Sequence, residues 1–140
     1  MNSPNTKLKY RNFLRDLKEL EHDSFISQLK FSLKQLPMLP HKIHWRVLLD
    51  LADLAKRECQ IKYACRLFRC ATQMQPYAYQ GWLEWAKLYE EAGELDKCKD
   101  LLREGLSYCR DNENLIVKSI KVYEKEKEYA KVRQLFMTND

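Results

Sequence analysis

The sequence predicts an all-α protein, a right-handed α-solenoid built from antiparallel helix hairpins. Three observations support this prediction. The 140 residues include only three glycines and four prolines, too few for the many tight turns of an all-β fold. Apolar residues recur every three or four positions along most of the chain, which is the period of an amphipathic helix. The sequence also matches itself at an offset of 34 residues, with two helices in each unit.

Residues 1–39 are expected to form a helical hairpin of their own. Apolar residues line one face of a first helix up to Leu20, and Asp23 and Ser24 then offer N-cap oxygens for a second helix. Pro37 and Pro40 disfavour continuation of that helix, so we place a domain boundary there. Only three leucines of this part keep the 34-residue register. We therefore interpret it as a degenerate repeat or a cap.

Residues 40–140 are expected to form three repeats of two helices each. The repeats cover approximately residues 45–78, 79–112 and 113–140. Their helices are predicted at 42–57, 60–74, 79–92, 94–109, 113–126 and 128–137. Equivalent positions carry similar residues without any gap, as in Leu48, Trp82 and Ile116 or Phe68, Leu102 and Phe136. Small residues are expected to let the paired helices approach closely, and they are Ala52, Ala64, Ala86 and Cys98.

These residues carry a family resemblance over positions 45–140. The second repeat resembles a tetratricopeptide repeat (TPR) at Trp82, Trp85, Ala86, Tyr89, Gly93, Cys98, Leu102 and Gly105, and the first repeat at Ala52, Ala64, Phe68, Ala71 and Pro76. Residues 81–93 are also similar to the related half-a-tetratricopeptide (HAT) repeat, which has paired aromatic residues followed by a glutamate. The resemblance implies a helical scaffold that binds proteins. HAT-like arrays occur in RNA-processing complexes, so it also implies such an assembly, in the nucleus rather than the cytoplasm.

In this family the first helix of each repeat lines a concave groove that holds a partner peptide or helix. The resemblance implies partner-binding positions at Arg46, Leu49, Asp53, Lys56, Arg57, Gln80, Leu83, Lys87, Glu90, Glu91, Asn114, Val117, Lys121, Glu124 and Lys125. These side chains suit a partner of mixed charge. The chaperone-binding branch of the family grips a C-terminal carboxylate with a Lys/Arg and Asn set. Here Asp50, Asp53, Glu84 and Lys87 stand at those positions, which argues against a chaperone-tail receptor.

No motif in the sequence indicates catalysis, a cofactor or a metal. Phosphate-binding glycine loops, nucleophile elbows and zinc-protease motifs are missing, so we expect a protein that is not an enzyme and needs no cofactor. His41 and His44 form an H-x-x-H pair without a third metal ligand beside them. The N-terminus does not resemble a secretory signal, and no apolar run is long enough for a membrane span. We interpret the five cysteines as reduced thiols of an intracellular protein.

The net charge of +5 is distributed in bands along the chain. Residues 1–44 carry +4, residues 45–78 carry +3, residues 79–113 carry −4 and residues 114–140 carry +2. One basic cluster comprises Lys7, Lys9, Arg11, Arg15 and Lys18, and a second comprises Lys56, Arg57, Lys62, Arg66 and Arg69. Direct RNA binding through these clusters is the alternative to protein binding. The acidic band between the basic bands disfavours one continuous RNA track.

The last predicted helix keeps an apolar stripe that no polar capping helix follows. Solenoids need polar terminal faces, so we expect the surface of residues 117–137 to contact a further repeat, a partner or a second copy. On this ground we expect the chain to be either a piece of a longer array or a subunit that docks onto another. A self-association module is therefore a further alternative function.

Overall fold

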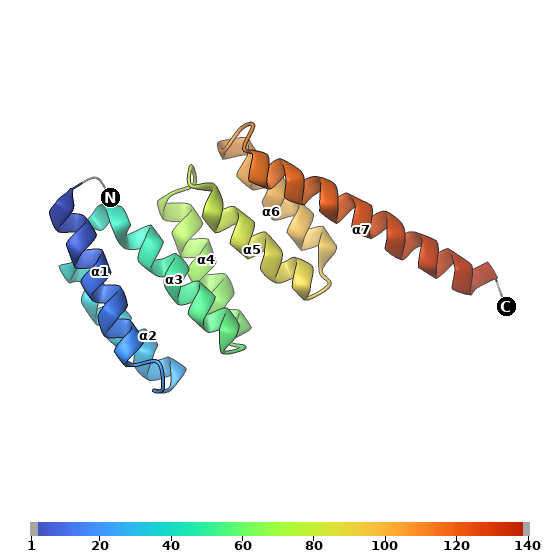
Figure 1. Ribbon diagram of the computed structural model, residues 1–140. Helices are drawn as coiled ribbons and strands as arrows, with labels where there is room; N and C mark the ends of the chain where they lie inside the picture. The colour runs from blue at the N-terminus through green and yellow to red at the C-terminus, as the bar shows by residue number, and fades with distance from the viewer. Residues whose placement is uncertain (1–2, 139–140) are drawn as a thin grey trace. The chain divides into compact units, whose positions relative to one another are not determined.

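The computed structural model describes residues 3–138, and every regular element in that range is a helix. The chain divides into two compact units, unit 1 from Met1 to Gln75 and unit 2 from Pro76 to Asp140. Antiparallel helix pairs make up unit 1 and begin unit 2 (Figure 1). The predicted all-α fold class of helix hairpins is thereby confirmed. No helix between residues 3 and 138 is long and apolar enough to cross a membrane.

Unit 1 begins with the hairpin of α1 (Pro4–Glu19) and α2 (Phe25–Gln35). The Oγ atom of Ser24 caps α2 by accepting a hydrogen bond from the backbone N–H of Ser27 at 3.2 Å. The proline-rich boundary then forms two short 3₁₀ turns, η1 (Leu36–Met38) and η2 (His41–Ile43). Because η2 leads directly into the next helix, the prolines end one hairpin without introducing a long linker.

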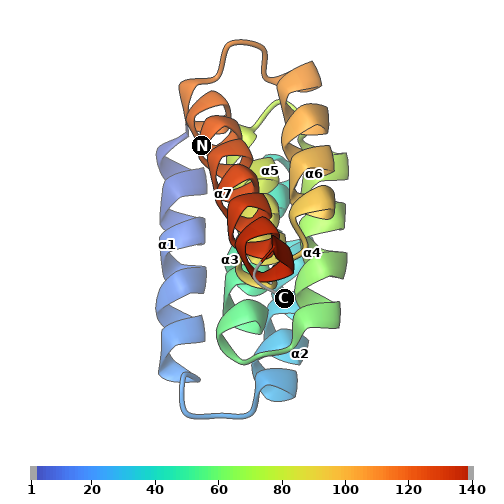
Figure 2. The same cartoon turned by 90° about the vertical axis from the view of Figure 1, so that its right-hand side faces the viewer.

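The second hairpin of unit 1 joins α3 (His44–Arg57) to α4 (Ile61–Met74), which run side by side (Figures 1 and 2). Ala52 and Ala64 are fully buried, and Phe68 is 1% exposed. The small side chains therefore lie in the interior, as the repeat pattern predicts. The chain reverses at Cys59, whose φ of 58° lies in the left-handed region that non-glycine residues seldom adopt.

Unit 2 begins with the hairpin of α5 (Tyr79–Glu91) and α6 (Leu95–Tyr108). The chain reverses at Gly93 with a φ of 78°, a conformation that glycine adopts without a steric penalty. Trp82 fills the space between the two helices and stacks on both Trp85 and Tyr108, at ring-centroid distances of 6.5 and 5.8 Å. Its indole N–H donates to the carbonyl oxygen of Pro76 at 2.8 Å. A methyl group on Gly105 would lie 2.7 Å from the Trp82 Cβ atom, so this close approach requires glycine.

The last repeat differs from the sequence-based expectation. Separate helices over 113–126 and 128–137 are predicted, whereas the structure has one continuous helix, α7 (Glu113–Thr138). The first half of α7 packs on α5 and α6, with Leu115 and Val122 fully buried. In the 34-residue register, Lys127 is equivalent to Cys59 and Gly93, the residues at which the two preceding hairpins reverse. Because lysine is a good helix former, the helix continues through this position and the prediction of a break there is wrong.

Candidate functional site

Each unit contains a surface hollow between the first helices of its repeats. The hollow of unit 1 has a volume of about 470 Å³ and is bounded by α1, α2 and α3. Leu14, Leu17 and Leu54 form its apolar walls. Four carboxylates and two permanent cations surround them, namely Glu21, Asp50, Asp53, Glu58, Lys18 and Arg57. The unit 1 hollow is therefore an apolar recess with a net acidic rim.

A half-buried polar network fixes one wall of the unit 1 hollow. The hydroxyl group of Tyr10 donates to the Asp50 Oδ2 atom at 2.5 Å, and the Nε–H of Arg46 donates to the Tyr10 hydroxyl oxygen at 3.2 Å. Burial, reinforced by the hydrogen bond to Asp50, raises the pKa of Tyr10 to about 12. Burial also raises the pKa of Asp50, against the opposing effects of Tyr10 and Arg46. Because this network joins α1 to α3, it orients both walls of the recess.

The rest of the rim is more accessible to a ligand. The Arg57 Nε atom lies 3.1 Å from the Asp53 Oδ2 atom, and their side chains are 67% and 60% exposed. Such an exposed pair contributes about 0–1 kcal/mol, so a partner's charge can displace it at little cost. An apolar recess with exchangeable acidic groups at its edge can hold a leucine-like side chain together with a neighbouring lysine or arginine.

The hollow of unit 2 has the opposite charge. It has a volume of about 390 Å³ between α5 and α7, with Leu83 and Val117 as its apolar side chains. The charged and polar groups on its lining are Lys87, Lys118, Lys121, Asn114 and Glu113. The Lys87 Nζ atom lies 3.4 Å from a Glu84 oxygen within the same helix. The side chain of Lys121 is exposed and makes no hydrogen bond or ion pair within residues 3–138. The unit 2 hollow therefore presents a positive rim.

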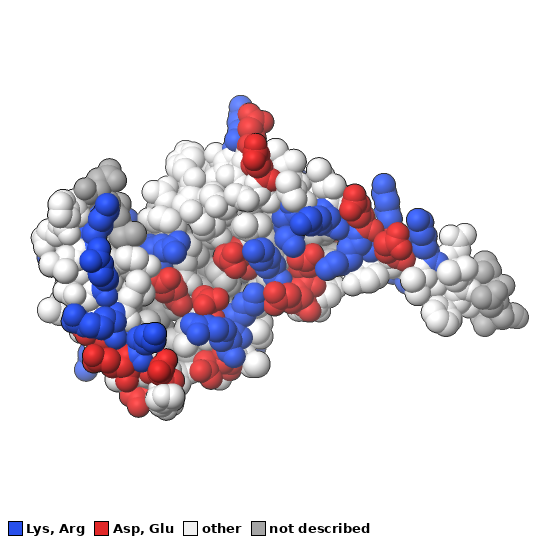
Figure 3. All heavy atoms as spheres, in the orientation of Figure 1, with Lys and Arg blue, Asp and Glu red and all other residues white. Residues whose placement is uncertain are grey.

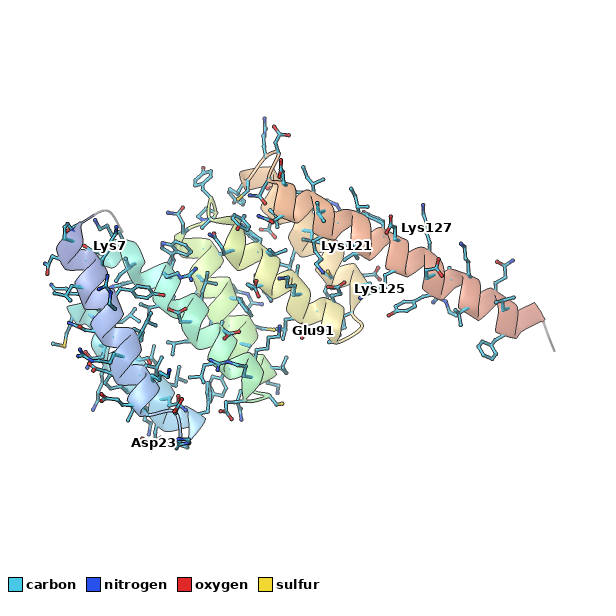
Figure 4. The ribbon with its side chains drawn as sticks, viewed as in Figure 1. Lys7, Asp23, Glu91, Lys121, Lys125 and Lys127 are labelled. Carbon is cyan, nitrogen blue, oxygen red and sulfur yellow. The ribbon has the colours of Figure 1, made fainter. Side chains whose placement is uncertain are left out.

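Ion pairs attach α7 to the α5–α6 hairpin beside this hollow. The carboxylate of Glu90, whose side chain is 10% exposed, accepts from Lys118 at 2.8 Å and from Lys125 at 3.0 Å. Burial opposes ionisation of Glu90, but the two lysines outweigh it and lower its pKa. Lys99 on α6 donates to Glu126 at 2.6 Å and lies 5.4 Å from the ring centroid of Tyr123. Figure 4 shows Lys125 directed from α7 toward the hairpin.

The structure brings together only some of the predicted groove residues. Asp53 and Arg57 line the unit 1 hollow, and Leu83, Lys87, Asn114, Val117 and Lys121 line the unit 2 hollow. Other predicted residues serve the fold. Leu49 is 7% exposed, Arg46 bonds to Tyr10, and Glu90 is paired with Lys118 and Lys125. The remaining predicted residues line neither hollow, and they are Lys56, Gln80, Glu91 and Glu124.

The sequence reasoning missed the residues that α1 and α2 supply to the unit 1 hollow. The sequence-based interpretation of residues 1–39 is a degenerate repeat or a cap, so no groove position is assigned there. Leu14 and Leu17 nevertheless keep the 34-residue register with Leu48 and Leu51, and this register is the signal that places α1 beside α3. Lys118 was missed because its distance from Glu90 in the sequence conceals their contact.

The first basic cluster lies on the surface of α1. Lys7, Arg11, Arg15 and Lys18 are all exposed and recur every three or four residues, so they form one basic column along the helix (Figure 3). Lys62, Arg66 and Arg69 are exposed on α4. The two histidines of the H-x-x-H pair lie with their rings 4.9 Å apart, and a ring nitrogen of His44 lies 3.0 Å from the carbonyl oxygen of Leu39.

Comparison with known proteins assigns this architecture to a family. The family model described as PRP6, TPR-like domain matches residues 38–138. A TPR-containing protein of Dictyostelium discoideum is 43% identical to this chain over 123 residues. That match covers 88% of this chain but only 9% of the relative, so the chain spans a small part of the length of the relative it matches. The predicted TPR-like character is confirmed by both comparisons.

Proposed function

Because the chain belongs to the PRP6, TPR-like domain family, we propose that it is a non-enzymatic scaffold that binds protein partners within a nuclear RNA-processing complex. The family takes its name from a splicing factor, which supports an RNA-processing role. We further propose that residues 1–39 act as a degenerate repeat or cap preceding three repeats at about 45–78, 79–112 and 113–140. The single observation that carries the binding role is the pair of hollows with opposite charge.

The two hollows suit segments of different composition. In unit 2, a leucine or similar side chain enters between Leu83 and Val117, while acidic neighbours meet Lys87 and Lys121. In unit 1, basic neighbours meet the exposed carboxylates of the rim, Glu21, Asp53 and Glu58. Burial of the apolar side chain provides most of the affinity, and the rim charges select the segment and speed its association. A partner of mixed charge therefore carries acidic and basic segments separately.

The experiment uses two fluorescein-labelled model peptides, one of alternating leucine and glutamate and one of alternating leucine and lysine. Fluorescence anisotropy at physiological salt measures their dissociation constants for the full chain. Lys121→Glu is expected to raise the dissociation constant of the acidic peptide roughly fivefold, because an exposed positive charge is replaced by a negative one. Glu58→Lys is expected to raise the dissociation constant of the basic peptide to a similar extent.

The controls are charge reversals outside the hollows. Lys131→Glu lies on the exposed second half of α7, and Glu19→Lys lies at the end of α1 away from the lining. Neither control should change the dissociation constant of either peptide by more than about twofold. If each control changes the dissociation constants as much as the hollow variant with the same charge change, binding depends on net charge alone and the two-groove assignment is wrong.

Direct RNA binding is the second candidate, and the basic column on α1 favours it. A labelled single-stranded RNA would be titrated at increasing salt with the wild type and with Arg11→Glu. RNA binding through the column predicts a steep fall of affinity with salt and a smaller slope in the variant. RNA affinity that is lost at physiological salt, while the peptides still bind, supports the scaffold.

A further inference from the structure

The two halves of α7 differ in how they are held. Up to Glu126 the helix is attached to the rest of unit 2, because Leu115 and Val122 are buried and Glu126 bonds to Lys99. From Lys127 to Met137 every residue is exposed. Attachment therefore ends one residue before Lys127, whose side chain points away from the hairpin (Figure 4). The second half of the helix extends without tertiary contacts that bury its side chains.

The apolar residues of α7 also change sides at this point. In the first half, Ile116, Ile120 and Tyr123 form one stripe and are 38%, 54% and 46% exposed. In the second half the stripe consists of Tyr129, Val132 and Phe136, at 51%, 48% and 75% exposure. At 3.6 residues per turn the two stripes lie on roughly opposite sides of one straight helix. A single helix packed on one partner needs one stripe, so this pattern suits two helices separated by a chain reversal.

The 34-residue register locates that reversal. Cys59 and Gly93, both with positive φ, are the reversal points of the α3–α4 and α5–α6 hairpins, and Lys127 is the next equivalent position. The positions equivalent to Ile120 and Val132 are fully buried in those hairpins and lie on helices that pack against each other. They are Ala52 with Ala64, and Ala86 with Cys98. Four of the six stripe residues of α7 therefore occupy positions that are buried in both preceding repeats, namely Ile116, Ile120, Val132 and Phe136.

We propose that the face formed by Ile116, Ile120 and Tyr123 is the docking surface for residues 128–137 of this same chain, which reach it when the chain reverses at Lys127. The continuous α7 is the open form, and the docked hairpin is the closed form. The inference concerns the conformation of unit 2 and does not depend on the proposed binding function.

Two residue choices lower the stability of the closed form relative to the open form. Lys127 favours the helix and resists the left-handed conformation that Gly93 adopts freely. Ile120 and Val132 are also bulkier than the alanine and cysteine at the equivalent positions, so the closed hairpin packs less closely. A partner that covers either stripe binds only the open form and therefore selects it. The closed form hides both stripes when no such partner is bound.

The test changes the reversal point. Lys127→Gly weakens the helix and removes the penalty of the left-handed conformation, which should favour the closed form by roughly 30-fold. Three measurements on the full chain follow the shift: amide hydrogen exchange at residues 127–130, the radius of gyration from solution scattering, and fluorescence of a dye that binds apolar surface. In the glycine variant, exchange should accelerate about tenfold or more while the radius and the dye signal both fall. Lys127→Ala should instead slow the exchange and keep the extended form.

A second substitution separates docking from simple loss of helix. Ile120 is 54% exposed in the open form, so Ile120→Asp leaves that form intact but places a charge in the proposed contact. Added to Lys127→Gly, it should restore the larger radius of gyration while exchange at the joint stays fast. The proposal is refuted if Lys127→Gly leaves the radius and dye signal unchanged. It is also refuted if sedimentation shows that the compaction occurs only in a dimer, because the face then receives a second copy.

Discussion

Replacing Gly105 with alanine tests the packing of α5 against α6. Two effects act on the stability in opposite directions, the gain in helix propensity and the steric overlap with Trp82. Alanine in a helix interior is more favourable than glycine by about 1 kcal/mol. At this site, however, the new methyl carbon would lie 2.7 Å from the Trp82 Cβ atom and 2.8 Å from its Cγ atom. Carbon atoms in contact prefer about 3.5–4.0 Å, so the helices must separate by on the order of 1 Å. The movement would also strain the hydrogen bond from the Trp82 indole N–H to the carbonyl oxygen of Pro76.

Overpacking of this kind costs about 1–3 kcal/mol, which exceeds the gain in helix propensity. We therefore expect Gly105→Ala to lower the free energy of unfolding of unit 2 by about 1 kcal/mol, measured by urea unfolding with tryptophan fluorescence. Ser107→Ala is the control, since Ser107 is exposed on the same helix and alanine there should be neutral or slightly stabilising. A Gly105→Ala protein that is more stable than the wild type would refute the close contact between Gly105 and Trp82.

Two further predictions concern titratable groups of unit 2. Glu90→Gln should lower the free energy of unfolding by about 1–3 kcal/mol at pH 7, because Lys118 and Lys125 lose their shared carboxylate. The pKa of Glu90 is lowered from 4.5, so its contribution to the free energy of unfolding is present above pH 4.5 and is lost as the pH falls through the lowered value. At roughly pH 3, urea unfolding should therefore show little difference in stability between the variant and the wild type. Burial and the nearby Glu90 carboxylate raise the pKa of the Cys98 thiol to about 11, so at about pH 8 a disulfide reagent should modify exposed Cys59 well before Cys98, and equal rates would contradict the buried position.

The helical hairpins could be predicted from the sequence because their information is local and repeated. Ala52, Ala64, Ala86 and Cys98 are fully buried where the register places them, and each contributes a small side chain at a helix contact. The continuation of α7 was not predicted, since periodicity locates apolar stripes but does not report whether a lysine will adopt a left-handed conformation. The reversal at Cys59 shows that a non-glycine residue sometimes does so.

The candidate site was less predictable than the fold. Helical spacing assigns residues to the correct helix, but it does not fix exactly which face of the helix each side chain occupies. Leu49 is therefore assigned to the groove although its side chain is buried at 7% exposure. Ion pairs between distant segments carry no local signal, which is why Glu90 was assigned to partner binding although it holds Lys118 and Lys125. In both errors, a side chain assigned to partner binding instead makes tertiary contacts that stabilise the fold.

The stacked indoles of Trp82 and Trp85 make unit 2 spectroscopically distinct. Their ring planes are 20° apart with centroids 6.5 Å apart, whereas the third tryptophan of the chain, Trp45, belongs to unit 1. Neighbouring indoles in a fixed arrangement couple their electronic transitions, and the coupled signal in circular dichroism vanishes when the rings separate. Wild-type protein thus contains an optical reporter for unit 2, and a Trp45→Phe variant leaves fluorescence from that unit alone. Melting of the two units can then be followed separately without any attached label.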